Sequence, residues 1–140
     1  MCLQAVIEHR VVPFSDPILA YKVFEWKGNG YLSPYRSNLA IPFSCTHAVR
    51  ANAKTVWAGN DIQKYETGFH CFRDRGDAEW LRQSLDRDYS APVGAGIFTV
   101  QPVAIWGNIT VGHEPRALGW DMVVYVAEFL LMKTGDSSCA

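Results

Sequence analysis

Ionisable residues stand beside aromatic, strand-like sequence in two stretches of this chain, residues 68–72 and 105–117. A guanidinium can bind a carboxylate or phosphate through two parallel hydrogen bonds, and a histidine can donate a further bond beside it. An indole can supply a stacking wall. If the two stretches are neighbours in one sheet, they form a pocket for a small anion or a nucleotide. The residues that we expect to bind a ligand there are His70, His113, Arg116, Trp106 and Glu128.

A purely structural interpretation of the same residues stays open. In it, Arg116 pairs with Glu114 or Asp121, and His70 bonds to a backbone carbonyl in the core. Clusters of polar residues mark functional sites only statistically, because structural ion pairs produce similar patterns.

The pairs of possible metal ligands do not have the spacing of a metal site. Cys45 and His47 are one residue apart, and His70 and Cys71 are adjacent. Zinc needs three or four ligands in tetrahedral geometry, whereas adjacent residues on a strand point to opposite faces. We therefore expect no metal and no cofactor. Cys71 lies between phenylalanines and is predicted to be a buried, inert thiol, and all four cysteines are expected to be free.

Composition narrows the class of partner. The 140 residues include 13 basic and 14 acidic side chains, for a formal charge of −1, without the basic excess of a nucleic-acid binder. The longest apolar run, Met122 to Met132, is interrupted by Glu128 and is shorter than the roughly 18 residues of a membrane span. No secretory signal is visible at the start. We expect a cytoplasmic protein with no membrane contact, and its 18 aromatic residues (five Trp, six Tyr and seven Phe) could form a face for a protein partner.

The hydrophobic pattern predicts an α+β fold with a mostly antiparallel sheet of four to six strands and one or two helices packed on one side. Alternation and β-branched content predict strands at 18–26, 68–72, 103–111 (with a bulge or a close neighbouring backbone at Gly107) and 120–131, and a return strand at 31–32. Helical spacing predicts helices at 46–58 and 75–86, the second beginning after Asp74. Residues 60–67, 92–96 and 112–119 are expected to form loops. A helix at 122–132 is the alternative to a strand there. We expect one domain over residues 1–133 and a flexible tail at 134–140.

Two resemblances can be stated. The strand at Tyr21 to Phe24, the Gly-Phe-His-Cys-Phe segment, the Ile105-Trp106-Gly107 strand and Arg116-Ala117 together resemble a group of short, uncharacterised bacterial and phage proteins. In that group Ala is usual where Cys71 stands. This resemblance implies a fold and no activity.

The second resemblance is local. Residues 68–80 are similar to the strand-to-helix step of ADP-ribosyltransferase-like domains. It implies that Lys22 stands near the NAD-binding position of an early strand and that Glu128 stands for the late catalytic glutamate.

These observations lead to two hypotheses. The first is a bacterial or phage accessory protein that binds a protein or a ligand through an aromatic-rich face. The alternative is a small ADP-ribosyltransferase-like or nucleotide-binding enzyme that uses His70, His113 and Arg116. The sequence leaves open whether the protein is an enzyme.

Overall fold

The structure is a computed structural model, and it describes residues 3–26, 30–32, 43–88, 97–116 and 120–133. Its elements in chain order are β1 (Ala5–Val12), β2 (Ile18–Trp26), β3 (Tyr31–Leu32), β4 (Val49–Arg50), β5 (Thr55–Trp57), β6 (Lys64–Glu66), β7 (Phe69–Phe72), α1 (Arg75–Asp88), β8 (Ile97–Arg116) and β9 (Trp120–Met132).

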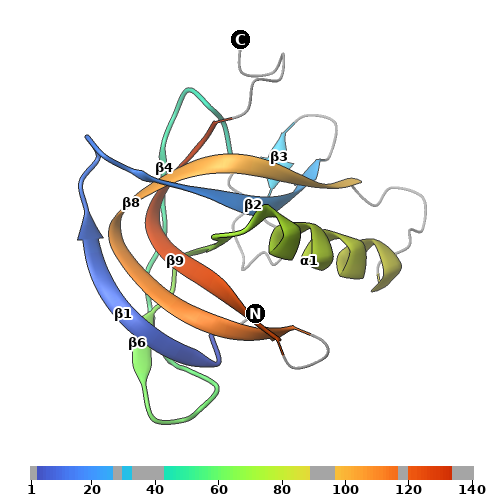
Figure 1. The fold of residues 1–140 in the computed structure, drawn as a ribbon. Helices are drawn as coiled ribbons and strands as arrows, with labels where there is room; N and C mark the ends of the chain where they lie inside the picture. The colour runs from blue at the N-terminus through green and yellow to red at the C-terminus, as the bar shows by residue number, and fades with distance from the viewer. Residues whose placement is uncertain (1–2, 27–29, 33–42, 89–96, 117–119, 134–140) are drawn as a thin grey trace.

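Two long antiparallel strands, β8 and β9, organise the main sheet (Figure 1). One edge of β8 pairs with β9. Its other edge pairs with β2 along the first half of the strand and with β1 along the second half. Strand β7 lies between β2 and β9, so the pairing path β8–β2–β7–β9 returns to β8. Every recorded pairing is antiparallel. The sheet therefore curls round on itself, and β1 is left at an edge.

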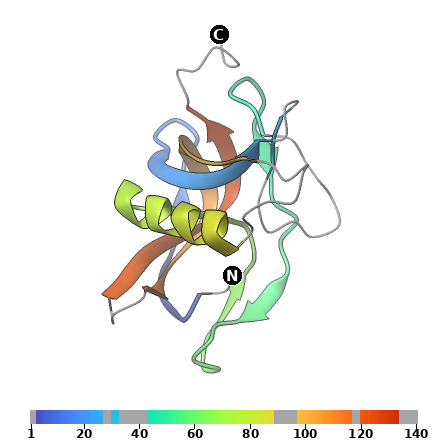
Figure 2. The same cartoon turned by 90° about the vertical axis from the view of Figure 1, so that its right-hand side faces the viewer.

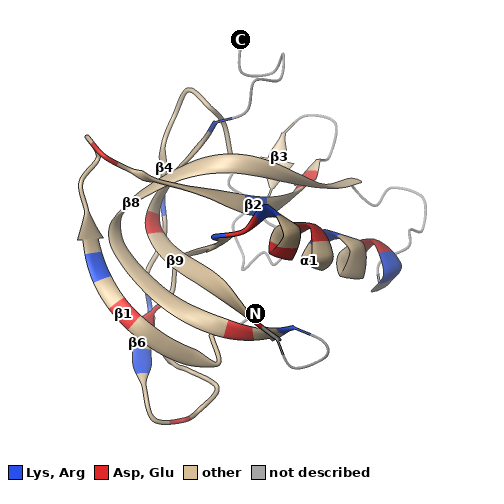
Figure 3. Ribbon diagram, viewed as in Figure 1, with Lys and Arg blue, Asp and Glu red and all other residues tan. Residues whose placement is uncertain are grey.

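Helix α1 covers one face of the curled sheet (Figure 2). It follows Asp74, whose backbone carbonyl accepts the N–H of Ala78 at 3.3 Å. The apolar stripe of the helix, Ala78, Leu81 and Leu85, is buried against the strands. Its outer side carries ion pairs such as that of Arg82 with Glu79, and charged residues are frequent along α1 and sparse on β8 and β9 (Figure 3).

The buried residues form two clusters on opposite faces of β9. Met122, Val124 and Val126 pack with the helix stripe and with Tyr65 of β6. Tyr125 and Ala127 face the other way and join a cluster that contains Phe24 and Ile105. Because side chains alternate along a strand, residue parity determines which cluster a side chain meets over residues 122–127 of β9, whereas Leu130 and Met132 join the cluster of Phe24.

A bulge interrupts β8 at Gly107. The register with β9 shifts between Trp106 and Ile109, and Gly107 has a φ of +83°, a conformation that favours glycine. A side-chain Cβ at this position would lie 2.6 Å from the Glu128 carboxylate. The predicted bulge is confirmed, and its conformation brings Asn108 towards β9.

The α+β class with a mostly antiparallel sheet is confirmed, as are the strands predicted around residues 18–26, 68–72, 103–111 and 120–131 and the helix predicted at 75–86. The predicted strand number was too low, since the main sheet has seven strands and a second sheet has two, and the described residues contain one helix. Helix α1 is neither long nor apolar enough to cross a membrane. The predicted turn at 92–96 and tail at 134–140 lie outside the described residues.

The helix predicted at 46–58 is wrong. Val49 and Arg50 pair with the outer edge of β9, and Thr55 to Trp57 pair with β6. Helical spacing of a few apolar residues was outweighed by cross-strand pairing, which is a tertiary interaction. The loops predicted at 60–67 and 112–119 are also partly wrong, because β6 lies within the first and β8 continues to Arg116.

Candidate functional site

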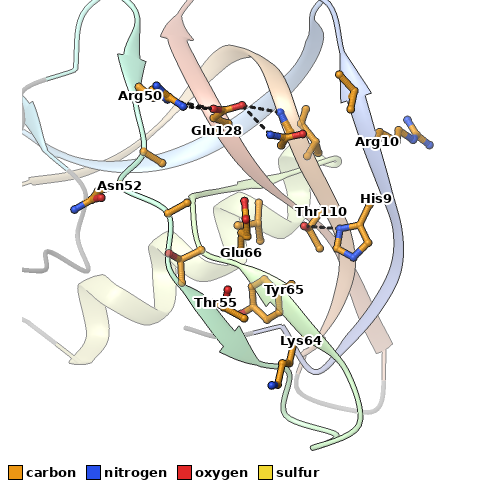
Figure 4. A pocket seen from close by; sticks show the side chains of 17 residues that line it. His9, Arg10, Arg50, Asn52, Thr55, Lys64, Tyr65, Glu66, Thr110 and Glu128 are labelled. Carbon is orange, nitrogen blue, oxygen red and sulfur yellow. Dashed lines mark hydrogen bonds and ion pairs between the residues drawn. The ribbon is translucent and has the colours of Figure 1, made fainter.

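An open groove of about 950 Å³ lies between the main sheet and the β5–β6 hairpin (Figure 4). Its walls and floor come from segments far apart in the sequence. They are residues 9–11 of β1, 50–53 and Thr55 from β4 to β5, 64–67 (β6 and the residue after it), 108–110 of β8, and Val126 and Glu128 of β9. Tyr65 fixes the hairpin against the sheet, because its buried hydroxyl accepts the backbone N–H of Leu3 at 2.9 Å.

Glu128 lies at one end of the groove and is fully engaged. One carboxylate oxygen accepts the backbone N–H of Asn108 at 3.0 Å and the side-chain amide of the same residue at 3.3 Å. The other oxygen accepts a hydrogen bond from Arg50 Nε at 3.1 Å and forms an ion pair with Arg50 Nη2 at 3.0 Å. The bulge therefore exposes a backbone donor that Glu128 satisfies, so this carboxylate holds the shape of the groove end.

The remaining charged groups along the groove offer little to an anion. The side chain of Arg10 points away from the groove and pairs with Glu8 (Figure 4). The ammonium of Lys64 lies 4.6 Å from the centre of the Trp57 ring. His9 forms a 3.0 Å hydrogen bond with Thr110 on the floor. Apart from Glu66, which has no recorded partner among the described residues, the charged side chains of the groove already interact with neighbours.

Unpaired hydrogen-bonding groups are found instead on the backbone of β1. Val6 directs both its N–H and its carbonyl away from β8, because both bond to the side-chain amide of Gln63 at 3.0 Å. Backbone groups alternate between the two edges of a strand, and one extra residue is inserted between Val6 and Glu8. His9 and Val11 consequently face outwards.

An independent contact supports this assignment. Val11 lies opposite Asn108 in the register, yet the Asn108 N–H goes to Glu128 on the β9 side rather than to β1. The pair is thus a non-hydrogen-bonded one, and the backbone of Val11 points away from β8. Within the described part of the chain, no hydrogen bond is recorded for the outward backbone groups of His9 and Val11.

Strand β6 presents a second unpaired edge to the groove. The N–H of Ala58 donates to the carbonyl of Gln63 at 2.8 Å, and the N–H of Thr67 donates to that of Lys54 at 2.7 Å. Gln63 and Thr67 therefore direct their backbone groups towards β5. Because this direction alternates along a strand, the backbone N–H and carbonyl groups of Lys64 and Glu66 point away from β5. In Figure 4, β6 lies between β5 and β1, so this edge faces β1 across the groove.

The residues predicted to form a pocket from the two histidines and Arg116 are distributed over both faces of the sheet. His70 and Glu114 share the face under α1, where His70 Nδ1 lies 3.6 Å from a carboxylate oxygen of Glu114. That separation is too long for a hydrogen bond, and neither oxygen of the buried Glu114 has a partner among the described residues. His113, next to Glu114 on β8, faces the opposite way.

Arg116 shares the face of Glu114 but interacts with the helix. It donates to Asp77 at 3.0 Å, and its guanidinium lies 5.6 Å from the centre of the Trp80 ring. Asp77, rather than the expected Glu114 or Asp121, is therefore the recorded partner of Arg116. Asp77 was not identified, because helix α1 is brought to β8 only by tertiary packing.

Trp106 lies outside the groove and is 8% exposed. Its ring stacks on Phe129 at 5.7 Å, and the edge of Phe14 approaches it at 5.0 Å. Phe14 is 69% exposed, so the aromatic cluster reaches the surface there. Of the five predicted ligand-binding residues, only Glu128 lines the groove.

A buried amine and a thiol lie inside the sheet. The ammonium of Lys22 donates to the His70 carbonyl at 3.2 Å, and burial lowers the pKa of this lysine. Burial also raises the pKa of the Cys71 thiol to about 12. Cys71 is fully buried, so it has neither the exposure nor the thiolate character of a nucleophile.

The expectation that all four cysteines are free is wrong for Cys45, which is disulfide-bonded. Its partner lies outside the described residues. The described residues hold no group of three or more side chains that could bind a metal ion.

Comparison of the chain with protein-family models, with curated proteins and with solved structures finds no match. The function must therefore be inferred from the groove itself.

Proposed function

We propose that this protein is a binding module and that its groove holds an extended segment of a protein partner. The observation that carries the proposal is the unpaired outer edge of β1, where the backbone groups of His9 and Val11 face a groove of about 950 Å³. An exposed strand edge is a template for pairing with another chain, and proteins use it to recognise extended peptides.

The charge of the groove favours a polypeptide over a small anion. Arg50 is committed to Glu128 and Arg10 to Glu8, so little positive charge is left for a phosphate or carboxylate. Apart from the carboxylate of Glu66, the hydrogen-bonding groups without a recorded partner at the groove are backbone donors and acceptors of the described strands β1 and β6. A peptide offers both kinds of group in alternation, whereas a nucleotide does not.

The nucleotide-binding or ADP-ribosyltransferase-like alternative gains no specific support. His70 and His113 face opposite sides of β7–β9 and β8, and Arg116 is bound to Asp77. Bacterial or phage origin and a cytoplasmic location stay predictions from the sequence. The disulfide at Cys45 is more typical of an oxidising compartment.

The proposal is tested by selecting short random peptides, displayed on phage, against the full chain. The affinity of the enriched peptides is then measured by fluorescence anisotropy. Thr55→Trp places a large ring in the groove from β5, where Thr55 is exposed. Gln83→Trp adds the same ring at an exposed position of α1, away from the groove, and serves as the matched control.

We expect Thr55→Trp to weaken binding at least tenfold and Gln83→Trp to leave it unchanged, with both variants keeping the wild-type melting temperature. The proposal fails if no peptide is enriched, or if the enriched peptides bind both variants equally well.

A further inference from the structure

We propose that the bound segment enters as a β-strand between β1 and β6, pairs with both edges, and joins the two sheets of the protein into one. This inference rests on the proposed function and specifies how the partner is recognised. It follows from the arrangement of the two edges, from the contact of Gln63 and from the charge of the groove.

The two unpaired edges stand apart by more than one strand spacing. If β1 and β6 were direct neighbours, their backbones would bond to each other at about 4.8 Å between strands. Instead, the side chain of Gln63 spans the gap and bonds to Val6 at 3.0 Å. Beyond Gln63 both edges are unpaired and line the groove, so the gap has room for a backbone between them.

Gln63 shows what the edge of β1 accepts. Its amide donates to the Val6 carbonyl and accepts the Val6 N–H, which is the pair of bonds that a strand residue would make. The side chain of Gln63 therefore forms the two hydrogen bonds that a residue of an added strand would form with Val6. A bound peptide would have to end there, because the amide of Gln63 already occupies the backbone groups of Val6. The outward backbone N–H and carbonyl groups of the next such residues, His9 and Val11, are the ones that remain for hydrogen bonds to the partner.

Strands β1 and β6 run in the same direction along the groove. Lys64, Tyr65 and Glu66 follow one another in the same sense as His9 and Arg10 (Figure 4). A single segment of opposite direction can therefore form antiparallel ladders with both edges at once, and antiparallel pairing is the slightly more stable form.

The floor of the groove suits uncharged residues, and the carboxylate of Glu66 on β6 is the one charged group of the lining without a recorded partner among the described residues. The floor beside His9 is formed by Thr110 and Val126, which are small and uncharged, and a charged residue over them would lose water without gaining a partner. Threonine and valine suit such a surface, and proline is excluded because it lacks an N–H. A segment of roughly five residues, the usual strand length, fits this description.

The test uses the peptides selected on phage, resynthesised with single N-methyl groups. In a strand, N–H groups of alternate residues point to opposite edges, so methylation of one set removes donors to β1 and methylation of the other removes donors to β6. We expect both sets to contain positions at which one methyl group weakens binding at least tenfold. Sensitivity in one set alone would overturn insertion between two edges while leaving the proposed function intact, and no sensitivity would exclude strand pairing altogether.

A variant of the protein checks the same point from the other side. Val11→Pro removes the outward N–H of Val11, which no described group uses, so the fold keeps its ladder with β8. Val11→Ala shortens the side chain but keeps the backbone N–H donor of residue 11. We expect tenfold weaker peptide binding for Val11→Pro and less than a threefold change for Val11→Ala, with melting temperatures used to verify that both fold. Equal binding by the two variants would contradict pairing with β1.

Discussion

The carboxylate of Glu128 accepts the backbone N–H of Asn108 at 3.0 Å and thereby satisfies the donor that the β8 bulge leaves unpaired. Glu128 is largely buried, whereas its other partner, Arg50, is 70% exposed at the side chain. The two ends of this network should therefore differ in their contribution to stability.

Glu128→Ala should lower the free energy of unfolding by about 0.5–1.5 kcal/mol, because it removes the acceptor of the Asn108 N–H together with the ion pair to Arg50. Arg50→Ala removes only an exposed partner and should cost about 0–1 kcal/mol. Urea denaturation of both variants measures the difference. Equal losses would mean that the ion pair, rather than the bulge contact, is the stabilising part.

Two glycines provide a matched pair for backbone effects. Gly107→Ala should destabilise the protein by at least about 1–2 kcal/mol, because φ is +83° and a Cβ would meet Glu128 and Phe129 at 2.6 Å. Gly76→Ala, in α1, meets nothing within 4 Å and should stabilise by about 0.4–1 kcal/mol. Thermal unfolding checks both signs, and a neutral Gly107→Ala would show that the bulge can relax.

The buried carboxylate of Glu114 has no recorded hydrogen-bond partner among the described residues, with His70 Nδ1 at 3.6 Å. Glu114→Met should raise the free energy of unfolding by about 1–3 kcal/mol, because it removes an unsatisfied polar group from the core. Glu66→Met, on an exposed strand position, is the control and should change stability by less than about 0.5 kcal/mol. A marked loss of stability in Glu114→Met would reveal a partner that satisfies this carboxylate.

Lys22→Met should stabilise the protein in a pH-dependent way. Burial lowers the pKa of Lys22 in the folded state below its ordinary value of 10.5. Below the folded-state pKa both states carry the proton, so the full cost of burying the charge is present. This cost disappears as pH rises from that pKa towards 10.5. The gain from Lys22→Met should thus be largest below the folded-state pKa of Lys22 and shrink as pH rises from that pKa towards 10.5.

Urea denaturation at several pH values measures this gain, and Lys54→Met, at an exposed position, should show no such trend. The Cys71 thiol acts with the opposite sign, because its pKa is raised from 9.0 to about 12 in the folded state. Above pH 9 the unfolded thiol ionises first, so stability falls in wild type and variant alike. A gain that grows with pH would contradict the buried-charge explanation for Lys22.

Sequence patterns correctly predicted the elements whose conformation depends mainly on residues near them in the chain. Alternation identified β2 and the middle of β8, and the stripe of Ala78, Leu81 and Leu85 identified α1. The segment at 46–58 failed because its conformation is set by the partners it meets, β9 and β6. Strand β1 was missed for the same reason, since most of its side chains are exposed and its sequence has no buried alternation.

The sequence by itself indicated the fold class, a special backbone position at Gly107 and a strand, with a helix as the alternative, that carries Glu128, because periodicity, glycine and β-branched content act within a few residues. Only the tertiary structure decided that Glu128 satisfies Asn108, that His70 and His113 face apart, and that β1 and β6 leave two backbone edges across a groove. Backbone donors are the same for almost every residue type. Whether they are paired depends on which strands meet, and no local pattern records that.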